Sequence, residues 1–199
     1  MQEKLKRRSN AARTEATRGA LLDAARDLFV HKGYADTGTP DIVARANVTR
    51  GALYHHFADK TDLFRAVVER EAQAVAKHIE GASANPTSAL EALTSGTDAY
   101  FEAMAVPGRV RLLLLEGPAV LGRAEIDRID RQTGGEELRE GLAYALDAQE
   151  ISPAVLGAMT KMLSAGFDRA ALAIAEGEPS ENYRQATNYL VEAIINKPR

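Results

Sequence analysis

The chain has 199 residues, of which 45% are hydrophobic and 27% are charged, and its formal charge is −3. These values are ordinary for a soluble globular protein of one large or two small domains. The absence of cysteine excludes disulfides and thiolate metal sites. The N-terminus is charged without a following apolar run, and no segment approaches the roughly 18 apolar residues that a membrane span needs. We therefore expect a cytoplasmic protein with no secretory signal and no membrane partner.

Basic residues gather toward the N-terminal end of the chain. Residues 1–60 hold 11 Lys+Arg and 7 Asp+Glu, a net charge of +4, whereas residues 61–199 hold 14 and 21, a net charge of −7. Residues 1–20 alone carry six basic and two acidic side chains. A basic arm on an acidic body indicates either an end that meets a polyanion or a solubilising tail, and charge by itself favours the tail.

The first two predicted helices lie within residues 14–47. The first runs from about Thr14 to a stop at Gly33, because apolar residues recur at the spacing of one helical face: Leu21, Ala25, Leu28 and Phe29. The second has Thr39 as its N-cap and Pro40 at its first helical position. It ends at Asn47, a residue type that tolerates the left-handed backbone conformation.

Two more helices are predicted before the first strong break. One covers residues 50–57, and the other begins near Asp59-Lys60 and continues to about Gly81. The apolar positions of the latter share one face: Leu63, Phe64, Val67 and Val68. Residues 81–86 follow, and their punctuation makes them the best domain boundary in the chain.

Glycine and proline divide the remaining chain into further helices, giving about nine in all. No strand alternation and no internal repeat is evident, so we predict an all-α fold. The predicted segments are a helix from about residue 86 that ends at Pro107-Gly108, a short apolar helix that stops at Gly117-Pro118, a helix around Leu138, Leu142 and Leu146, a long helix opened by Ser152-Pro153, and a last helix after Pro179.

The segment RGALYHHF, residues 50–57, combines a glycine with four successive aromatic or imidazole side chains. On a helical wheel Leu53 and Phe57 lie about 40° apart and form a buried seam, whereas Gly51 and His55 lie on the opposite side. A glycine that faces outward lets the backbone approach another surface closely. Two short helices joined by a short turn form a helix-turn-helix, and its second helix reads bases mainly with its N-terminal residues.

The residue types at this helix suit DNA. Arg50 lies near the seam direction and reaches DNA only from the protruding N-terminus of the helix, where arginine bonds a guanine edge at two points. Tyrosine, histidine and lysine suit phosphate oxygens. A metal site at His55 and His56 is disfavoured, because adjacent helical residues point about 100° apart and no further ligand lies at i+4.

Residues 43–64, VARANVTRGALYHHFADKTDLF, resemble the DNA-binding signature of TetR-family repressors, and the resemblance extends over about residues 14–64. It includes the pattern AARDLFVHKGY in the first helix and the entry into the second at residues 37–42. The sequence departs from the family at Asn47, where glycine is usual, and at Gly38, where a Ser or Thr cap is common. Thr39 is then the substitute cap.

The resemblance implies a particular set of DNA contacts. Two residues at the start of the third helix would contact bases, four would contact phosphates, and two threonines would help at the helix starts. The base contacts would be Arg50 and Gly51, the phosphate contacts would be Tyr54, His55, His56 and Lys60, and the two threonines would be Thr39 and Thr49.

The resemblance also divides the chain into an N-terminal arm with a helix-turn-helix domain, residues 1–58, and a helical effector-binding and dimerisation domain, residues 59–199. Apolar residues at helical spacing are either plain core or a ligand pocket, and the candidates for ligand contact are Tyr100, Phe101, Met104 and Phe167. The last two helices of each chain would form a four-helix dimer interface, with Leu163, Phe167, Leu190 and Ile194 in it.

We interpret the chain as a homodimeric transcriptional regulator that binds a palindromic double-stranded DNA operator and is released by an unidentified small molecule, with no cofactor. We infer repression because members of the family that the sequence resembles are usually repressors, and activation is the alternative. One alternative keeps DNA binding without a small molecule, under the control of a protein partner or of none. An apolar cavity in the C-terminal domain would favour the small molecule, and a solidly packed domain would favour this alternative. The other alternative is a helical enzyme, but GxSxG, HExxH, GxGxxG and the Walker loop are all missing.

Overall fold

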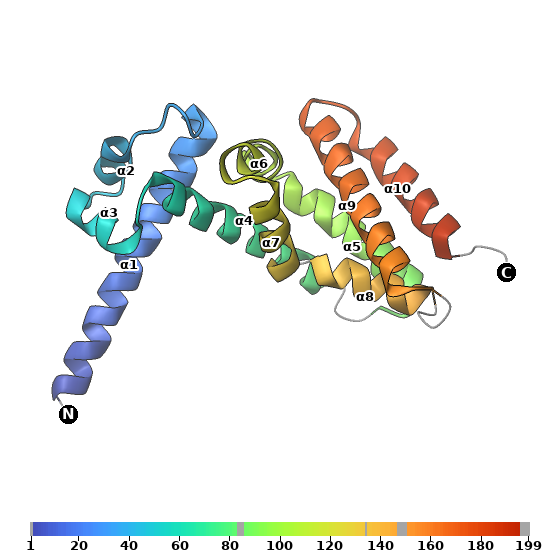
Figure 1. Cartoon of the computed structure of the whole chain (residues 1–199), viewed down its shortest axis with the longest axis horizontal. Coiled ribbons are helices and arrows are strands. Elements are labelled where there is room, and N and C mark those ends of the chain that lie inside the picture. The colour runs from blue at the N-terminus through green and yellow to red at the C-terminus, as the bar shows by residue number, and fades with distance from the viewer. Residues whose placement is uncertain (1, 83–85, 134, 147–150, 196–199) are drawn as a thin grey trace.

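The computed structural model describes residues 2–82, 86–133, 135–146 and 151–195, with side chains from residue 11 onward and, in the helix that begins at residue 135, from residue 138. Ten α-helices and one π-helical segment make up this part of the chain, and none of it is strand (Figure 1). The predicted all-α class is confirmed. None of the described helices is long and apolar enough to cross a membrane.

The first three helices form a small head at one end of the molecule, and the fourth leads from it into the body (Figure 1). Their bounds are α1 Gln2–Lys32, α2 Thr39–Arg45, α3 Arg50–His56 and α4 Lys60–Ala82. The predicted start of α1 near Thr14 is wrong, because the basic arm is helical too. Residues 2–13 contain no glycine or proline and several strong helix formers, so the helix continues toward the N-terminus.

The turns of the head are set by backbone conformation. Gly33 ends α1 with φ 87°, and Asn47 adopts φ 53° in the α2–α3 turn, as predicted. The prediction that Thr39 caps α2 is wrong. The N-cap is Gly38, which has extended backbone and no capping side chain, so its carbonyl accepts the first helical bonds while Thr39 is already helical. Thr49 does cap α3, because its hydroxyl accepts a hydrogen bond from Ala52 N at 3.2 Å.

The body contains the remaining helices. They are α5 Ala89–Met104, the π-helical segment η1 Arg111–Glu116, α6 Gly117–Leu121, α7 Arg123–Thr133, α8 Gly135–Ala145, α9 Pro153–Ala175 and α10 Ser180–Ile195. Helix α4 packs along α5, and α9 and α10 lie side by side at the far end from the head (Figure 1).

Two predictions in the body are wrong. The helix expected to stop at Gly117-Pro118 continues to Leu121, because Gly117 N bonds Leu112 O in a π turn. We attribute the continuation to this wider turn, which removes the clash that proline causes in a regular helix. Helix α7 was missed, because its sequence RAEIDRIDRQT offers only two large apolar residues to reveal a helical face.

The head and the body share one hydrophobic core. Phe29, Leu53 and Phe64 are fully buried in the head, and the same cluster reaches Leu112 of η1 and Ile129 of α7. The first half of α4 belongs to this core, while later residues of α4 pack in the body. Helix α4 is therefore packed into both regions.

Candidate DNA interface and effector cavity

Helix α3 presents one face to solvent and buries the other. Leu53 and Phe57 are 0% and 3% exposed, as the helical wheel predicted. Gly51 and His55 are exposed, and Tyr54 is 44% exposed despite its aromatic ring. An exposed helix that carries a glycine, an arginine and a tyrosine is suited to enter a groove of DNA.

Three of the predicted DNA contacts lie together at the start of α3. The guanidinium of Arg50 lies 5.5 Å from the ring centroid of Tyr54. A hydrogen bond with the Thr39 hydroxyl, and then one with Arg50, lowers the pKa of the Tyr54 phenol. Residues of α2 and α3 thus converge on one polar, cationic point of the surface.

Gly51 has room for a side chain in the free protein. A Cβ atom built at Gly51 would meet only the Thr49 hydroxyl, at 3.9 Å. No contact within the described structure therefore requires glycine at this position. A close approach of the backbone to another molecule would explain why position 51 is a glycine.

Lys60 is turned toward the protein. Its ammonium donates to the carbonyls of Tyr34 and Thr37 at 2.9 and 3.1 Å, and it lies 4.2 Å from the centroid of the Tyr34 ring. These bonds fasten the start of α4 to the α1–α2 loop and use two of the three donors of the ammonium. Any phosphate contact from Lys60 would use the remaining donor or break one of these bonds.

The two histidines lie next to one another at the end of α3. The ring centroids of His55 and His56 are 5.3 Å apart, and the His56 ring also lies 6.3 Å from that of Phe57. His55 is exposed, whereas His56 is half-buried. No group of three or more potential metal ligands gathers anywhere among the residues that the structure describes.

The body contains a cavity of about 920 Å³, at the upper end of the size range of small-molecule sites. Helices α4, α5, α7, α8 and α9 and the segment η1 all contribute to its wall, which is mainly aliphatic on the side of α4. Among the predicted ligand contacts, Tyr100, Met104 and Phe167 line the cavity, whereas Phe101 is buried outside its lining.

Three polar groups converge beside the aromatic part of the wall. The Tyr100 hydroxyl donates to Asp168 Oδ1 at 2.8 Å, and Asp130 also lines the cavity. Burial raises the pKa of both carboxyls, and the Asp168 charge raises that of Asp130 further. Burial, followed by the Asp168 charge, also raises the pKa of Tyr100 well above its ordinary value.

The segment η1 touches the cavity and the head at once. Leu113 and Leu114 line the cavity. Arg111 donates to the carbonyl of Val30 in α1 at 3.0 Å, and the Glu116 carboxylate accepts from Tyr34 N at 3.1 Å. A π-helical segment is less regular than an α-helix and is frequent at functional sites.

A buried ion triad also joins the two regions. The Glu71 carboxylate on α4 is bonded by Arg26 of α1 at 2.8 Å and by Arg109 of the α5–η1 loop at 2.9 Å. Burial alone would raise the pKa of Glu71, but these hydrogen bonds outweigh it and lower the pKa. The two arginines therefore favour the charged form of Glu71 at this junction.

The residues predicted for the dimer interface lie in different environments. Phe167 is only 9% exposed and faces the cavity, and Leu163 and Ile194 pack on a core cluster of the same chain. Leu190 is 59% exposed. The exposed apolar and small residues form a stripe on each of the last two helices: Val155, Ala158 and Met162 on α9, and Ala186, Tyr189, Leu190 and Ala193 on α10.

Sequence reasoning missed the polar residues of the cavity and of the junction. A usable signal existed for Glu71, because a carboxylate between Val67 and Val75 at i+4 spacing interrupts an apolar face. For Asp130 the signal was absent, because α7 itself was not recognised. Asp168 follows Phe167 directly, and nothing in the local sequence separates it from a solvated acid.

The fold and the exposed α3 define a DNA-binding regulatory protein with a separate ligand-binding domain. Residues 21–67 match the family described as "Bacterial regulatory proteins, tetR family", and residues 90–197 match "Tetracyclin repressor-like, C-terminal domain". The chain belongs to the TetR family. It is therefore a transcriptional regulator and not an enzyme.

Individual relatives agree with this family. A solved TetR-family transcriptional regulator from Pectobacterium atrosepticum is 33% identical with a TM-score of 0.70, and the match covers 94% of this chain and 98% of that one. The transcriptional activator FasR of Mycolicibacterium smegmatis is 33% identical over 96 residues, 48% of this chain and 44% of that protein. The regulator AcrR of Shigella flexneri is 42% identical over 62 residues, 31% of this chain and 29% of that protein. The chain thus matches less than half the length of these two curated relatives.

Proposed function

We propose that the protein is a homodimeric repressor that binds a palindromic operator and leaves it when a small molecule enters the cavity of the body. The observation that carries this proposal is that η1 contacts both the cavity and the head. Leu113 and Leu114 of η1 line the cavity, and Arg111 of η1 donates a hydrogen bond to the end of α1. A ligand that displaces η1 therefore displaces the head.

The proposed DNA contacts begin at the N-terminus of α3. Arg50 reads a guanine edge, and the backbone at Gly51 lies close to the bases. Tyr54, with Thr39 beside it, contacts phosphate, as do His55 and His56. Thr49 helps through its hydroxyl proton, since its oxygen already caps the helix. Lys60 contributes mainly by fixing the start of α4.

A second copy of the chain covers the exposed stripes on α9 and α10. Met162 is 75% exposed and Tyr189 is 71% exposed, which is unusual for large apolar side chains unless another surface covers them. The contact is isologous, with each stripe meeting its own copy across a two-fold axis. Two α3 helices then face two half-sites, and the operator is a palindrome.

The effector acts through two arrangements of the heads. It shifts the equilibrium only by its difference in affinity for the two arrangements. Helix α4 and the junction of Glu71 with Arg26 and Arg109 move with the head, so the cavity and the spacing of the two α3 helices are coupled. In the released arrangement the two α3 helices no longer match successive major grooves.

Relatives support this proposal and show where it extends beyond the family assignment. The structure of RolR in complex with resorcinol, 18% identical with a TM-score of 0.66 over 94% of this chain and 97% of that one, shares the fold and holds a small molecule. BepR of Brucella suis is named a repressor and FasR an activator. The cavity favours a small molecule over a protein partner as the controlling agent, since a protein partner requires no internal space.

Selection of bound DNA from a random pool, followed by a screen for compounds that release it, tests the proposal. We expect a palindromic consensus and at least one releasing compound. A non-palindromic consensus, or release by a protein from the same cells and by no compound, would contradict it.

A further inference from the structure

We propose that Arg111 and Glu116 form a latch that holds the head in the arrangement that binds the operator, and that the π-helical register of η1 closes this latch. Opening of the latch frees the head. This inference rests on the proposed function, because it names the contact through which the cavity controls the head.

The latch caps the C-terminal end of α1. The carbonyl of Val30 and the amide of Tyr34 stand four positions apart in the chain, as the two partners of an α-helical hydrogen bond do. Because α1 ends at Lys32, these two groups bond the latch instead. Arg111 Nη1 donates to Val30 O at 3.0 Å, and Tyr34 N donates to a carboxylate oxygen of Glu116 at 3.1 Å. The latch therefore supplies partners that the end of a helix leaves missing.

The two latch residues form an ion pair at an unusual spacing. Arg111 Nη2 and Glu116 Oε1 lie 2.9 Å apart, although the residues are five positions apart in the chain. Residues at this spacing point about 140° away from one another around a regular α-helix. In a π-helix, residues i and i+5 are the hydrogen-bonding partners and lie on the same side. The pairing of Arg111 with Glu116 therefore depends on the π-helical register of η1.

Two glycines make the latch possible. The amide of Gly117 donates to Leu112 O in the π turn, and a Cβ atom built at Gly117 would lie only 2.8 Å from that carbonyl oxygen. A side chain at position 117 is therefore incompatible with this turn. A Cβ atom at Gly33 would lie 2.5 Å from Arg111 Nη2 and 2.9 Å from Glu116 Oε1. The first glycine allows the register of η1, and the second lets the ion pair approach the end of α1.

The latch segment also borders the cavity. Leu113 and Leu114, which lie between the two latch residues in the chain, line the cavity, and Leu112 is fully buried in the core that the head and the body share. Figure 1 shows α6, which continues η1, between the head and the helices α5 and α9. A ligand that moves the two leucines therefore moves the segment that carries Arg111 and Glu116.

A head that is held in place favours operator binding. Two copies of α3 have to lie at one spacing to enter successive major grooves, and a head that moves freely has to be ordered when DNA binds. Helix α1 packs against α2 and α3, so a latch at its end restricts the helix that enters DNA. The closed latch raises the fraction of heads that are ready to bind, and the observed affinity rises with this fraction.

The test uses the full chain and the DNA that the wild-type chain selects from a random pool. Glu116→Ala removes both the acceptor of the Tyr34 amide and the partner of Arg111, and it should weaken DNA binding by about threefold to thirtyfold. The Tyr34 amide should lose its protection from hydrogen exchange, while the amides of residues 21–29 keep theirs. A general loss of stability would instead expose both sets of amides.

Gly117→Ala tests the register, because it keeps both latch side chains and disturbs only the π turn. It should show the same two effects as Glu116→Ala. The double variant should bind DNA no more weakly than the weaker of the two single variants, since both remove one contact. Glu116→Ala introduces a strong helix former, so it tests the latch even if Gly117→Ala fails to fold.

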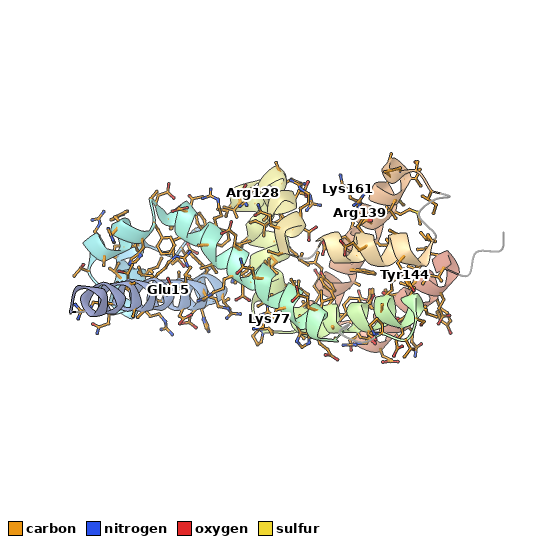
Figure 2. All side chains as sticks on the ribbon, turned by 90° about the horizontal axis from the view of Figure 1, so that it is seen from below. Glu15, Lys77, Arg128, Arg139, Tyr144 and Lys161 are labelled. Carbon is orange, nitrogen blue, oxygen red and sulfur yellow. The ribbon has the colours of Figure 1, made fainter. Side chains whose placement is uncertain are left out.

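Glu125→Ala is the matched control for Glu116→Ala. The Glu125 side chain is 26% exposed against 18% for Glu116, and it pairs with Arg128 of its own helix at 2.8 Å. Figure 2 shows Arg128 between Glu15 of α1 and Tyr144 of α8. The control removes the same side chain and the same charge without touching the end of α1, so DNA affinity should stay within about threefold.

Gly81→Ala is the control for Gly117→Ala, because a Cβ atom at Gly81 of α4 meets no atom within 4 Å. It should bind DNA as the wild type does. Three results would overturn the inference: a Tyr34 amide that stays protected in Gly117→Ala, equal losses of affinity in Glu116→Ala and Glu125→Ala, or losses that add in the double variant.

Failure of the latch and failure of the proposed function are distinguishable. If Glu116→Ala and Gly117→Ala bind the selected DNA as the wild type does, and a compound from the screen still releases it, the latch is wrong and the small-molecule mechanism stands. If both variants expose the Tyr34 amide and weaken DNA binding while no compound releases the wild type, the latch is right and the small-molecule mechanism is wrong.

Discussion

The head and the body use charge in opposite ways. In the head the cationic and polar groups lie on the surface, where Arg50 and Tyr54 are exposed to solvent. In the body the carboxylate of Glu71 is buried, and that of Asp168 is half-buried at the cavity. Exposed charges give attraction at little cost in stability, whereas buried charges cost stability unless they are paired. The exposed cationic surface of the head therefore costs the fold less stability than the enclosed carboxylates of the body do.

The largest expected effect comes from variants in the body that prevent dimerisation and thereby weaken DNA binding by the head. Leu190→Glu and Met162→Glu should each give monomers, because a charge replaces an exposed apolar contact at the proposed interface. Each protomer should stay folded, yet operator affinity should fall by about a hundredfold or more, since one half-site replaces two. Sedimentation at micromolar concentration and a DNA titration measure both effects.

Tyr144→Glu is the control for these variants, because Tyr144 is 80% exposed on α8 and outside the stripes. It should stay dimeric. A wild-type chain that sediments as a monomer would remove the basis of the two-half-site argument.

The junction between head and body gives the next largest effect. Glu71→Gln should lower the free energy of unfolding by about 2–4 kcal/mol, because the buried Arg109 and the partly exposed Arg26 lose their shared counter-charge. Denaturant unfolding measures the change. The pKa of Glu71 is lowered, so wild-type stability from this group is present above its unfolded pKa and is lost as pH falls through the lower folded pKa.

Glu69→Gln is the matched control on the same helix. Glu69 pairs with Arg128 at 2.7 Å, with both side chains about one-third exposed, and its loss should cost less than about 1 kcal/mol. Similar losses for the two variants would show that the triad is no stronger than a surface pair.

Base readout by the head gives a smaller effect with a distinct signature. Arg50→Ala should cost about 1–3 kcal/mol of operator binding and relax preference at one base position, as loss of a two-point guanine contact would. Arg13→Ala, on the N-terminal part of α1, should weaken all sequences alike and reduce the salt slope by about one. An unchanged base preference in Arg50→Ala would reassign Arg50 to the phosphate backbone.

A substitution at Gly51 that adds one carbon atom should affect stability and DNA binding in different ways. Gly51→Ala should hold or raise thermal stability, by up to about 1 kcal/mol, because alanine favours the helix and the added Cβ has space. It should nevertheless weaken operator binding, since the methyl group holds the backbone away from the bases. Normal binding by this variant would leave no DNA role for the glycine.

The smallest effect concerns the cost of the cavity charges. The raised pKa of Asp130 means that the folded chain binds this proton more readily than the unfolded chain. Stability from this group is present below its ordinary pKa and is lost as pH rises through the raised folded pKa. Asp130→Asn should therefore stabilise the ligand-free protein at pH 7, by less than about 1 kcal/mol because part of the carboxylate faces water. A loss of stability in thermal unfolding at pH 7 would show that the charged form is favoured there.

The sequence determined the head more fully than the body, for a physical reason. The left-handed turn at Asn47 and the seam of Leu53 and Phe57 depend on neighbours within a few residues, and both were predicted, whereas the start of α1 at Gln2 was not. The prediction that Thr39 caps α2 was wrong because the N-cap is the residue with extended backbone just before the helix, and that residue is Gly38. The DNA contacts assigned to individual residues of the head remain predictions.

Only the tertiary structure decided which side chains meet across the body. The sequence placed apolar residues at helical spacing, but it could not show that Phe167 faces a cavity while Leu190 faces solvent. It also could not bring Asp130 and Asp168, 38 positions apart in the chain, to one cavity, or Arg26 and Arg109 to Glu71. Such pairings depend on how helices cross, and helix crossing is set by the packing of whole faces rather than by any local run of residues.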